Sequence, residues 1–151
     1  MSDITTIAVA VVVQDGCVLV GRRASDALDA AGLHEFPGGK VEAGESPETA
    51  AARECLEEAG VSVRVGPLLD RAAGKTLRGP LEILFFTATP VDRSAKPLRP
   101  FQWIPIRELP ACSFPAANAR VLAALVRDLA AQRATSAESA GGDSTPRQGG
   151  S

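Results

Sequence analysis

Residues 39–61 read GKVEAGESPETAAARECLEEAGV and contain a glycine-containing loop that leads into an acidic helix. Ser46 and Pro47 are typical of a helix start, because a serine side chain caps free amide groups and proline fits the first helical position. Gly60 is typical of the residue that follows a helix C-terminus. The pattern therefore predicts a helix over residues 47–59, entered directly from the loop at residues 38–45.

At 100° per residue, this helix separates apolar from acidic side chains. The expected core stripe consists of Ala52, Cys55, Leu56 and Ala59, and the opposite side carries Glu54, Glu57 and Glu58. A solvated charged face is one interpretation of such a helix. However, Glu54 and Glu58 form a like-charge pair four residues apart, which weakens a helix. A cluster of carboxylates on a rigid element is what a hard cation such as Mg²⁺ needs, and Mg²⁺ in turn recruits phosphates.

The spacing of Gly39, Glu45 and the run from Arg53 to Val61 resembles the Nudix box of the Nudix hydrolase family. One soft departure is Cys55, where the family usually has an aliphatic residue, and cysteine packs as a small hydrophobe. The resemblance implies an α/β fold, namely a Nudix α/β/α sandwich with a mixed β-sheet between helices. It also implies hydrolysis of a nucleoside diphosphate linked to another group.

The resemblance further implies roles for individual residues. Glu54, Glu57 and Glu58, joined by the carbonyl of Gly38, would bind Mg²⁺, with Mn²⁺ as the alternative ion. The implied catalytic residues are Glu54, Arg53 and Glu57, with Glu54 as the base that activates water. Arg53 and Glu45 would orient the loop and the helix.

Two further stretches resemble the MutT subgroup, which removes oxidised guanine nucleotides from the precursor pool. One runs over residues 21–27 and 33–40, and the other is Phe-Pro-Ala-Ala-Asn at 114–118. The implied substrate-binding residues are Arg23, Glu35, Phe36, Pro37, Gly38 and Asn118. Asn118 would read the purine edge, since an amide offers both a donor and an acceptor. The structural alternatives are a helix cap for Asn118, a surface position for Arg23 and a core position for Phe36.

Two departures from the subgroup leave the preferred nucleotide open. Leu28 stands about where the subgroup often carries a histidine, and the loop at residues 95–100 lacks an acidic residue, for which Asp92 and Glu82 are candidate replacements. We expect a diphosphatase that converts 8-oxo-dGTP to the monophosphate and pyrophosphate. The alternatives are hydrolysis of CTP, a modified pyrimidine nucleotide or ADP-ribose, a non-catalytic nucleotide-binding module, or a structural protein. Retention of every box glutamate favours the enzyme.

The rest of the chain predicts a mixed sheet with a helix on each face. Residues 4–13 and 17–20 form a hairpin around Asp15-Gly16, residues 24–32 a loop, and residues 36–39 a tight turn. Residues 61–65, 81–89 and 103–106 are expected strands, and residues 115–133 an amphipathic helix. The Nudix domain would span residues 1–133, and residues 134–151 would be a disordered tail.

Composition narrows the classes of partner. The chain has 151 residues, a net charge of −2 and three widely spaced cysteines, which indicate neither a disulfide framework nor a zinc site. No basic field favours a nucleic acid polymer or a membrane, so the expected partner is a small nucleotide. The N-terminus lacks the features of a signal peptide, and a cytoplasmic monomer or small homo-oligomer is expected.

Overall fold

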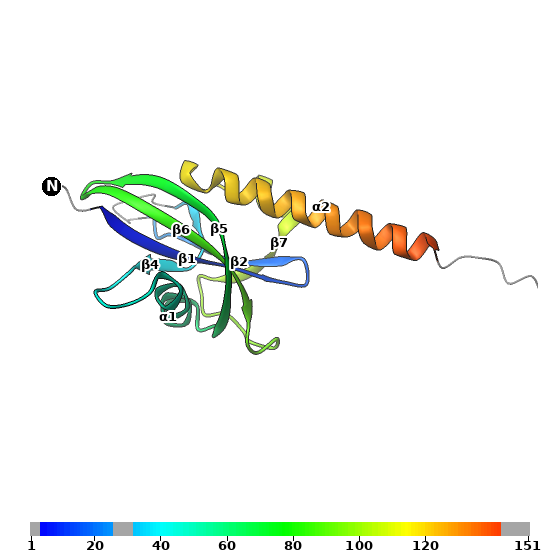
Figure 1. Ribbon diagram of the computed structural model, residues 1–151, viewed down its shortest axis with the longest axis horizontal. Helices are drawn as coiled ribbons and strands as arrows, with labels where there is room; N and C mark the ends of the chain where they lie inside the picture. The colour runs from blue at the N-terminus through cyan, green and yellow to red at the C-terminus, as the bar shows by residue number, and fades with distance from the viewer. Residues whose placement is uncertain (1–3, 26–31, 143–151) are drawn as a thin grey trace, which may run out of the picture.

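The computed structural model describes residues 4–25 and 32–142 (Figure 1). In chain order the elements are β1 (Thr5–Gln14), β2 (Cys17–Arg22), β3 (His34–Glu35), β4 (Gly38–Lys40), α1 (Pro47–Ala59), β5 (Val63–Thr76), β6 (Gly79–Pro90), β7 (Gln102–Pro105), the 3₁₀ helices η1 (Ile106–Ala111) and η2 (Ala116–Asn118), and α2 (Ala119–Gly142). Figure 1 shows α1 and α2 on opposite sides of the sheet. The expected mixed sheet between helices is confirmed.

Strand β1 is the centre of the sheet. Along one edge, β1 pairs with the parallel strand β6. Along its other edge, it pairs with the antiparallel strands β4 and then β2. Successive side chains of a strand point to opposite faces. Ala8 and Ala10 therefore pack in the cluster beneath α1, whereas Val9 and Val11 pack in the cluster beneath α2. Both faces of β1 are buried, which explains its continuous run of apolar residues.

The hairpin between β1 and β2 turns as the sequence predicts. Asp15 and Gly16 have φ values of 51° and 74°, so both adopt the left-handed conformation that a tight two-residue turn requires. Glycine adopts this conformation without steric cost, and aspartate tolerates it.

Helix α1 has the predicted bounds and caps. The Oγ of Ser46 accepts a hydrogen bond from the backbone N–H of Thr49 at 3.1 Å, and Gly60, with φ of 69°, donates its N–H to the carbonyl of Leu56 at 3.0 Å. The predicted core stripe is partly wrong. Leu56 is 51% exposed, and the buried residues are Ala50, Ala51, Cys55 and Ala59.

The buried face of α1 differs from the predicted stripe because of the strands against which the helix packs. The helix packs against both β1 and the edge strand β4, so its buried arc is wider than one stripe. The arc includes small alanines, which allow close approach to the sheet, and it brings Glu58 inward. Glu58 therefore lies beside the core rather than opposite it.

The predicted tight turn at residues 36–39 is wrong, because Gly38 and Gly39 belong to strand β4. They pair with Val9 and Ala8 of β1, and neither glycine has a positive φ. Their lack of a side chain serves close approach instead. A Cβ added to Gly38 would lie 2.6 Å from the carbonyl oxygen of Ala8 and 2.9 Å from the Cα of Val9.

The C-terminal helix differs from the prediction at both ends. Residues 116–118 form the 3₁₀ turn η2, and α2 continues from Ala119 past the expected boundary at residue 133 to Gly142. Alanine-rich sequence has high helix propensity, which extends α2 beyond its last contact with the core. Leu28, most of the expected loop at residues 24–32, and residues 143–151 of the expected tail lie outside the described residues.

Helix α2 is the longest helix of the described part of the chain. None of the described helices is both long and apolar enough to span a membrane.

A truncation tests how much of α2 the fold needs. Removal of residues 136–151 should leave the melting temperature unchanged, since the side chains of residues 130–135 are already exposed. Leu125→Ala is the matched control in the same helix. Leu125 is 6% exposed, and its truncation should cost about 2–4 kcal/mol of unfolding free energy. Thermal melts measure the melting temperatures of both variants. A lower melting temperature of the truncated protein would show that the removed segment packs on the domain.

Candidate active site

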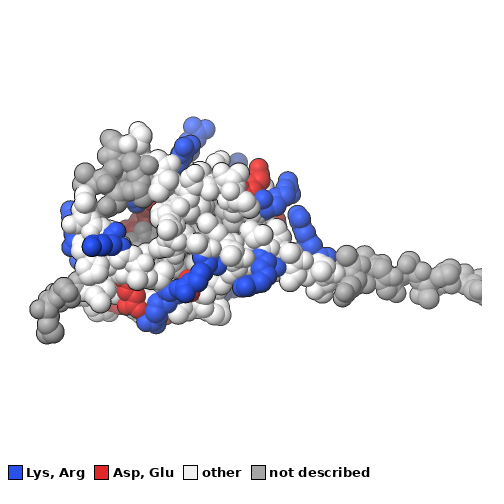
Figure 2. All heavy atoms as spheres, turned by 90° about the horizontal axis from the view of Figure 1, so that it is seen from above, with Lys and Arg blue, Asp and Glu red and all other residues white. Residues whose placement is uncertain are grey.

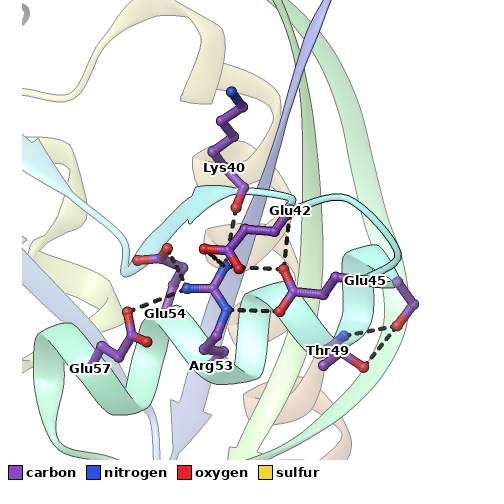
Figure 3. Close-up of polar contacts among 8 residues, drawn as sticks. Lys40, Glu42, Glu45, Thr49, Arg53, Glu54 and Glu57 are labelled. Carbon is purple, nitrogen blue, oxygen red and sulfur yellow. Dashed lines mark hydrogen bonds and ion pairs between the residues drawn. The ribbon is translucent and has the colours of Figure 1, made fainter.

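Arg53, in the middle of α1, is the centre of a network of ion pairs (Figure 3). Its Nε and Nη2 donate to the two carboxylate oxygens of Glu45 at 2.7 and 3.0 Å, and Nη2 also donates to the carbonyl of Lys40 at 3.2 Å. The bidentate bond holds the pKa of Glu45 below its usual value, with a further contribution from the N–H of Glu42. Arg53 thus ties the loop and the end of β4 to α1.

The same guanidinium also holds two of the glutamates predicted to bind metal. Nη1 of Arg53 donates to Glu54 Oε1 at 2.9 Å and to Glu57 Oε2 at 3.3 Å. Figure 3 shows both carboxylates turned toward the guanidinium from the helix side. The bond to Glu45 is the main cause that raises the pKa of Arg53 above its ordinary value, and the bond to Glu54 adds to it. The cation offsets part of the repulsion among the clustered carboxylates.

Glu58 occupies a different environment, between α1 and β4. Its Oε1 accepts a hydrogen bond from the backbone N–H of Gly38 at 3.1 Å. Burial raises the pKa of Glu58 to about 7; the Gly38 bond opposes this shift, and the nearby charges of Glu35 and Glu54 add to it. A carboxylate in this position is costly to ionise unless a cation lies close to it.

Gly39 brings Glu54 against the backbone of β4. A Cβ added to Gly39 would lie 2.6 and 2.7 Å from the two carboxylate oxygens of Glu54. Only glycine leaves this space free. Gly38 and Gly39 of β4 therefore face Glu58 and Glu54 of α1, although 15 or more residues separate them in sequence.

The donor set in this region fits a hard divalent cation. Carboxylate and backbone carbonyl oxygens are the ligands that Mg²⁺ prefers, and Glu54, Glu57, Glu58 and the carbonyl of Gly38 supply them. Across the described ranges, 4–25 and 32–142, no three acidic, histidine or cysteine side chains already stand in metal-ligating geometry. The reason is visible in the contacts, since Arg53 holds Glu54 and Glu57. The raised pKa of Glu58 is the feature that a bound cation would relieve.

A pocket of about 630 Å³ opens on the α2 face of the sheet, next to β4. Its floor consists of apolar side chains of β1 and β6, including Val9, Ile83 and Phe85. The pocket is lined by Arg23, Glu35, Phe36, Gly38 and Asn118, which are five of the six residues predicted to bind substrate. The sheet edge at Gly38 and Gly39 therefore separates this pocket from the glutamates of α1.

Four of these lining residues have partners for their side chains. Arg23 Nη1 donates to Glu35 Oε2 at 3.0 Å, and the rings of Phe36 and Phe114 lie with centroids 4.9 Å apart. Phe36 is 5% exposed, so it fills core and borders the pocket at the same time. Asn118 Nδ2 donates to the carbonyl of Pro115 at 3.2 Å, whereas a helix-capping side chain would accept from an amide.

Pro37 is the predicted substrate-binding residue that the structure places elsewhere. Its side chain is fully buried, and its carbonyl accepts a hydrogen bond from the N–H of Ala10 at 2.9 Å. Pro37 holds the segment before β4 on β1 rather than lining the pocket.

The two candidates for an additional acidic ligand bind local partners. Glu82 accepts from Arg71 Nη1 at 2.6 Å across β5 and β6. Asp92 accepts from the hydroxyl and the N–H of Ser94 at 2.7 and 2.9 Å, which holds its pKa below the usual value. Neither contact brings the carboxylate to the glutamates of α1.

Sequence reasoning missed part of the pocket wall. His34 lines the pocket from β3, and residues 73–76 line it from the hairpin that joins β5 to β6. These residues have no motif, and only the pairing of β6 with β1 brings the hairpin to this position. A second pocket, of about 440 Å³, lies between β5 and α2 and contains none of the predicted site residues.

Charge on the α2 side of the molecule is dispersed. Lys and Arg side chains stand apart from one another there and are separated by uncharged surface (Figure 2). Recognition of an anionic ligand on this side would therefore depend on a few local residues, such as Arg23, rather than on a broad positive field.

Comparisons with known proteins agree with this geometry. The chain matches the NUDIX domain over residues 4–125. It is 35% identical over 112 residues to an 8-oxo-dGTP diphosphatase of Escherichia coli (strain K12), covering 73% of this chain and 86% of that protein. It is 46% identical over 57 residues to a CTP pyrophosphohydrolase of the same organism, covering 38% of this chain and 42% of that protein.

Solved structures share the fold. The solution structure of the E. coli ORF135 protein aligns with a TM-score of 0.69 at 26% identity, over 85% of this chain and 93% of that chain. The crystal structure of a MutT protein from Methanosarcina mazei Go1 aligns with a TM-score of 0.68 at 22% identity, over 82% and 94% of the two chains. The chain therefore belongs to the NUDIX family, and its relatives place it among the MutT-like Nudix hydrolases.

Proposed function

We propose that the protein hydrolyses 8-oxo-dGTP to 8-oxo-dGMP and pyrophosphate with Mg²⁺, and so removes an oxidised precursor from the nucleotide pool. The observation that carries this proposal is the position of Gly38 and Gly39. They form a narrow sheet edge with the pocket of Asn118 on one side and the carboxylates of Glu54 and Glu58 on the other. A nucleotide whose base fills the pocket can extend its phosphates across this edge to the acidic helix.

Asn118 is the residue proposed to recognise the base. Oxidation at C8 of guanine converts N7 from an acceptor into an N–H donor, while O6 stays an acceptor. The amide of Asn118 can offer NH₂ to O6 and C=O to N7–H, and so pairs with the oxidised base but not with ordinary guanine. The aromatic pair Phe36 and Phe114 would supply apolar surface beside the base.

At the other end of the site, residues of the chain orient the loop and take a proton from the attacking water. Arg53 fixes the loop on the helix through Glu45, and Glu54 is our candidate for the base that takes a proton from the attacking water. Glu54, Glu57, Glu58 and the Gly38 carbonyl would hold the cation. When bound, Mg²⁺ would offset charge on the phosphoryl oxygens and so ease attack at phosphorus.

A second candidate function is hydrolysis of CTP. The 46% identity to a CTP pyrophosphohydrolase supports it, although that similarity covers 57 residues, against 112 for the 8-oxo-dGTP diphosphatase. A substrate panel separates the two candidates. Purified protein with Mg²⁺, and separately with Mn²⁺, should release pyrophosphate fastest from 8-oxo-dGTP, when compared with dGTP, CTP and ADP-ribose. Fastest turnover of CTP would replace the proposed substrate with the second candidate.

Replacement of a single carboxylate tests the metal site. Glu57→Gln and Glu58→Gln should each lower kcat/KM by at least roughly 100-fold, the upper end of what loss of an outer-shell partner of a metal costs. Glu58→Gln should still fold. In metal-free protein at pH 8 it should be at least as stable as wild type, because burial penalises the charge that the substitution removes. Kinetics and thermal melts measure both effects, and Glu48→Gln is the control on an exposed face of the same helix.

Gly39→Ala tests whether the sheet edge must stay free of side chains. The added methyl group would displace the carboxylate of Glu54, which is the far end of a flexible side chain, so the fold should survive while activity is lost. Circular dichroism and pyrophosphate release report on the two properties separately. An active Gly39→Ala variant would contradict the placement of Glu54 against β4.

Asn118→Ala tests base recognition. Loss of the amide leaves groups of the oxidised base unpaired, which should cost roughly 1–3 kcal/mol in transition-state binding. The ratio of kcat/KM for 8-oxo-dGTP to that for dGTP should therefore fall by about 10-fold or more, as measured by pyrophosphate release. An equal loss on both substrates would assign Asn118 a purely structural role.

A further inference from the structure

His34 is the only histidine of the chain, and it lines the pocket from β3. Its backbone N–H donates to the carbonyl of Ser113 at 2.7 Å, and the backbone N–H of Ser113 donates to the ring Nδ1 of His34 at 3.0 Å. His34 thus binds the backbone of one residue, Ser113, 79 residues away in sequence, once through its own backbone and once through its ring.

The bond from Ser113 defines the state of the imidazole. The amide of Ser113 always carries its hydrogen, so Nδ1 can accept only when it has a free lone pair. The ring is then neutral, with its proton on Nε2. Protonation of Nδ1 would place two N–H groups against each other. Nδ1 could then turn to the Ser113 carbonyl, 3.3 Å away, but the Ser113 amide would lose its acceptor.

Ser113 begins the short segment that carries Asn118. The next residue, Phe114, packs its ring at 5.8 Å from the ring of His34 and at 4.9 Å from that of Phe36. Pro115 and the turn η2 then lead to Asn118. The position of Asn118 over the pocket therefore depends on how firmly Ser113 is held.

The far end of this segment has its own anchor. Arg120, two residues after Asn118, donates to Asp70 Oδ2 at 3.2 Å and to the carbonyl of Arg71 at 2.7 Å. Both acceptors belong to β5. The segment from Ser113 to Arg120 is therefore fixed to β3 at one end and to β5 at the other, on two sides of the pocket.

We propose that His34 is a positioning residue for base recognition, which holds Ser113, and through it Asn118, by accepting the Ser113 amide on Nδ1. The inference rests on the proposed function and adds to it a residue that sets substrate affinity. Loss of this hydrogen bond should raise KM. The phosphate end of the site keeps its geometry, so kcat changes little.

The charged and titratable groups around His34 come from several elements. Arg22 lies opposite it on β2 and donates its Nε to the carbonyl of Gly32. Glu35 follows on β3 and pairs with Arg23. The segment at residues 113–118 carries no titratable side chain, and the thiol of Cys112 precedes it. Lys75 lines the opposite wall of the pocket.

Nuclear magnetic resonance of the wild-type protein tests the contact directly. Because the Ser113 amide donates to Nδ1, the single imidazole should be in the Nε2–H tautomer at pH 8. A ring that carries its proton on Nδ1 would overturn the proposal.

Two matched variants test the consequence for catalysis. His34→Asn keeps an acceptor near the position of Nδ1 but cannot titrate, and His34→Phe keeps a ring beside Phe114 but has no acceptor. At pH 8, KM of His34→Asn should equal that of wild type. KM of His34→Phe should be roughly threefold to tenfold higher, the worth of one hydrogen bond.

An unchanged KM in His34→Phe would overturn the proposal, as would a KM of His34→Asn as high as that of His34→Phe. The effect of His34→Phe should also vanish in an Asn118→Ala background, because both substitutions act through the same amide. Additive effects would show that His34 does not act through Asn118.

The kinetic series uses whichever nucleotide the substrate panel shows to be turned over fastest. If that nucleotide is CTP, the proposed substrate fails, yet the His34 comparison still decides whether the ring positions the segment. If 8-oxo-dGTP is preferred and the variants do not differ, the proposed function stands and the role of His34 fails.

Discussion

The contact between the glycine edge of β4 and the acidic side of α1 is the constraint on which the site depends. Gly38 donates its N–H to Glu58, and Gly39 leaves the space that the carboxylate of Glu54 occupies. A side chain on Gly38 would meet the backbone of β1, and a side chain on Gly39 would displace the carboxylate of Glu54. Because the edge is narrow, carboxylates on one face of the sheet and a pocket on the other are separated only by a strand backbone.

Arg53 offsets part of the electrostatic cost of this arrangement. Three glutamates on one side of a helix repel one another, and a buried carboxylate such as Glu58 is costly to ionise. Arg53 offsets part of this repulsion by binding Glu54 and Glu57 while its bidentate bond to Glu45 keeps it in place. The site therefore combines repulsion among the glutamates with a rigid frame built by Arg53 and Glu45. Such a local conflict is expected where a structure is adapted to bind a ligand.

The local elements of the site could be predicted because their causes are local. Ser46, Pro47 and Gly60 define α1 through capping interactions within a few residues, and Asp15-Gly16 defines the first hairpin through its φ values. Predictions failed where a distant partner decided the outcome. Gly38 and Gly39 look like a turn in isolation, but β1 pairs with them and makes them a strand. The buried face of α1 likewise depends on packing against β4. The periodicity of apolar residues within the helix carries no information about that contact.

The sequence by itself determined the NUDIX family, the bounds of the acidic helix and the residue types of the site, because spacing along one helix places carboxylates on one surface. Only the tertiary structure decided which of those residues meet. Val9 of β1 pairs with Gly38 on one side and with Phe85 of β6 on the other, and this register gathers the pocket from segments far apart in sequence. Hydrogen bonds such as those between His34 and Ser113 depend on register and packing over the whole chain, and therefore have no signature in any local stretch of sequence.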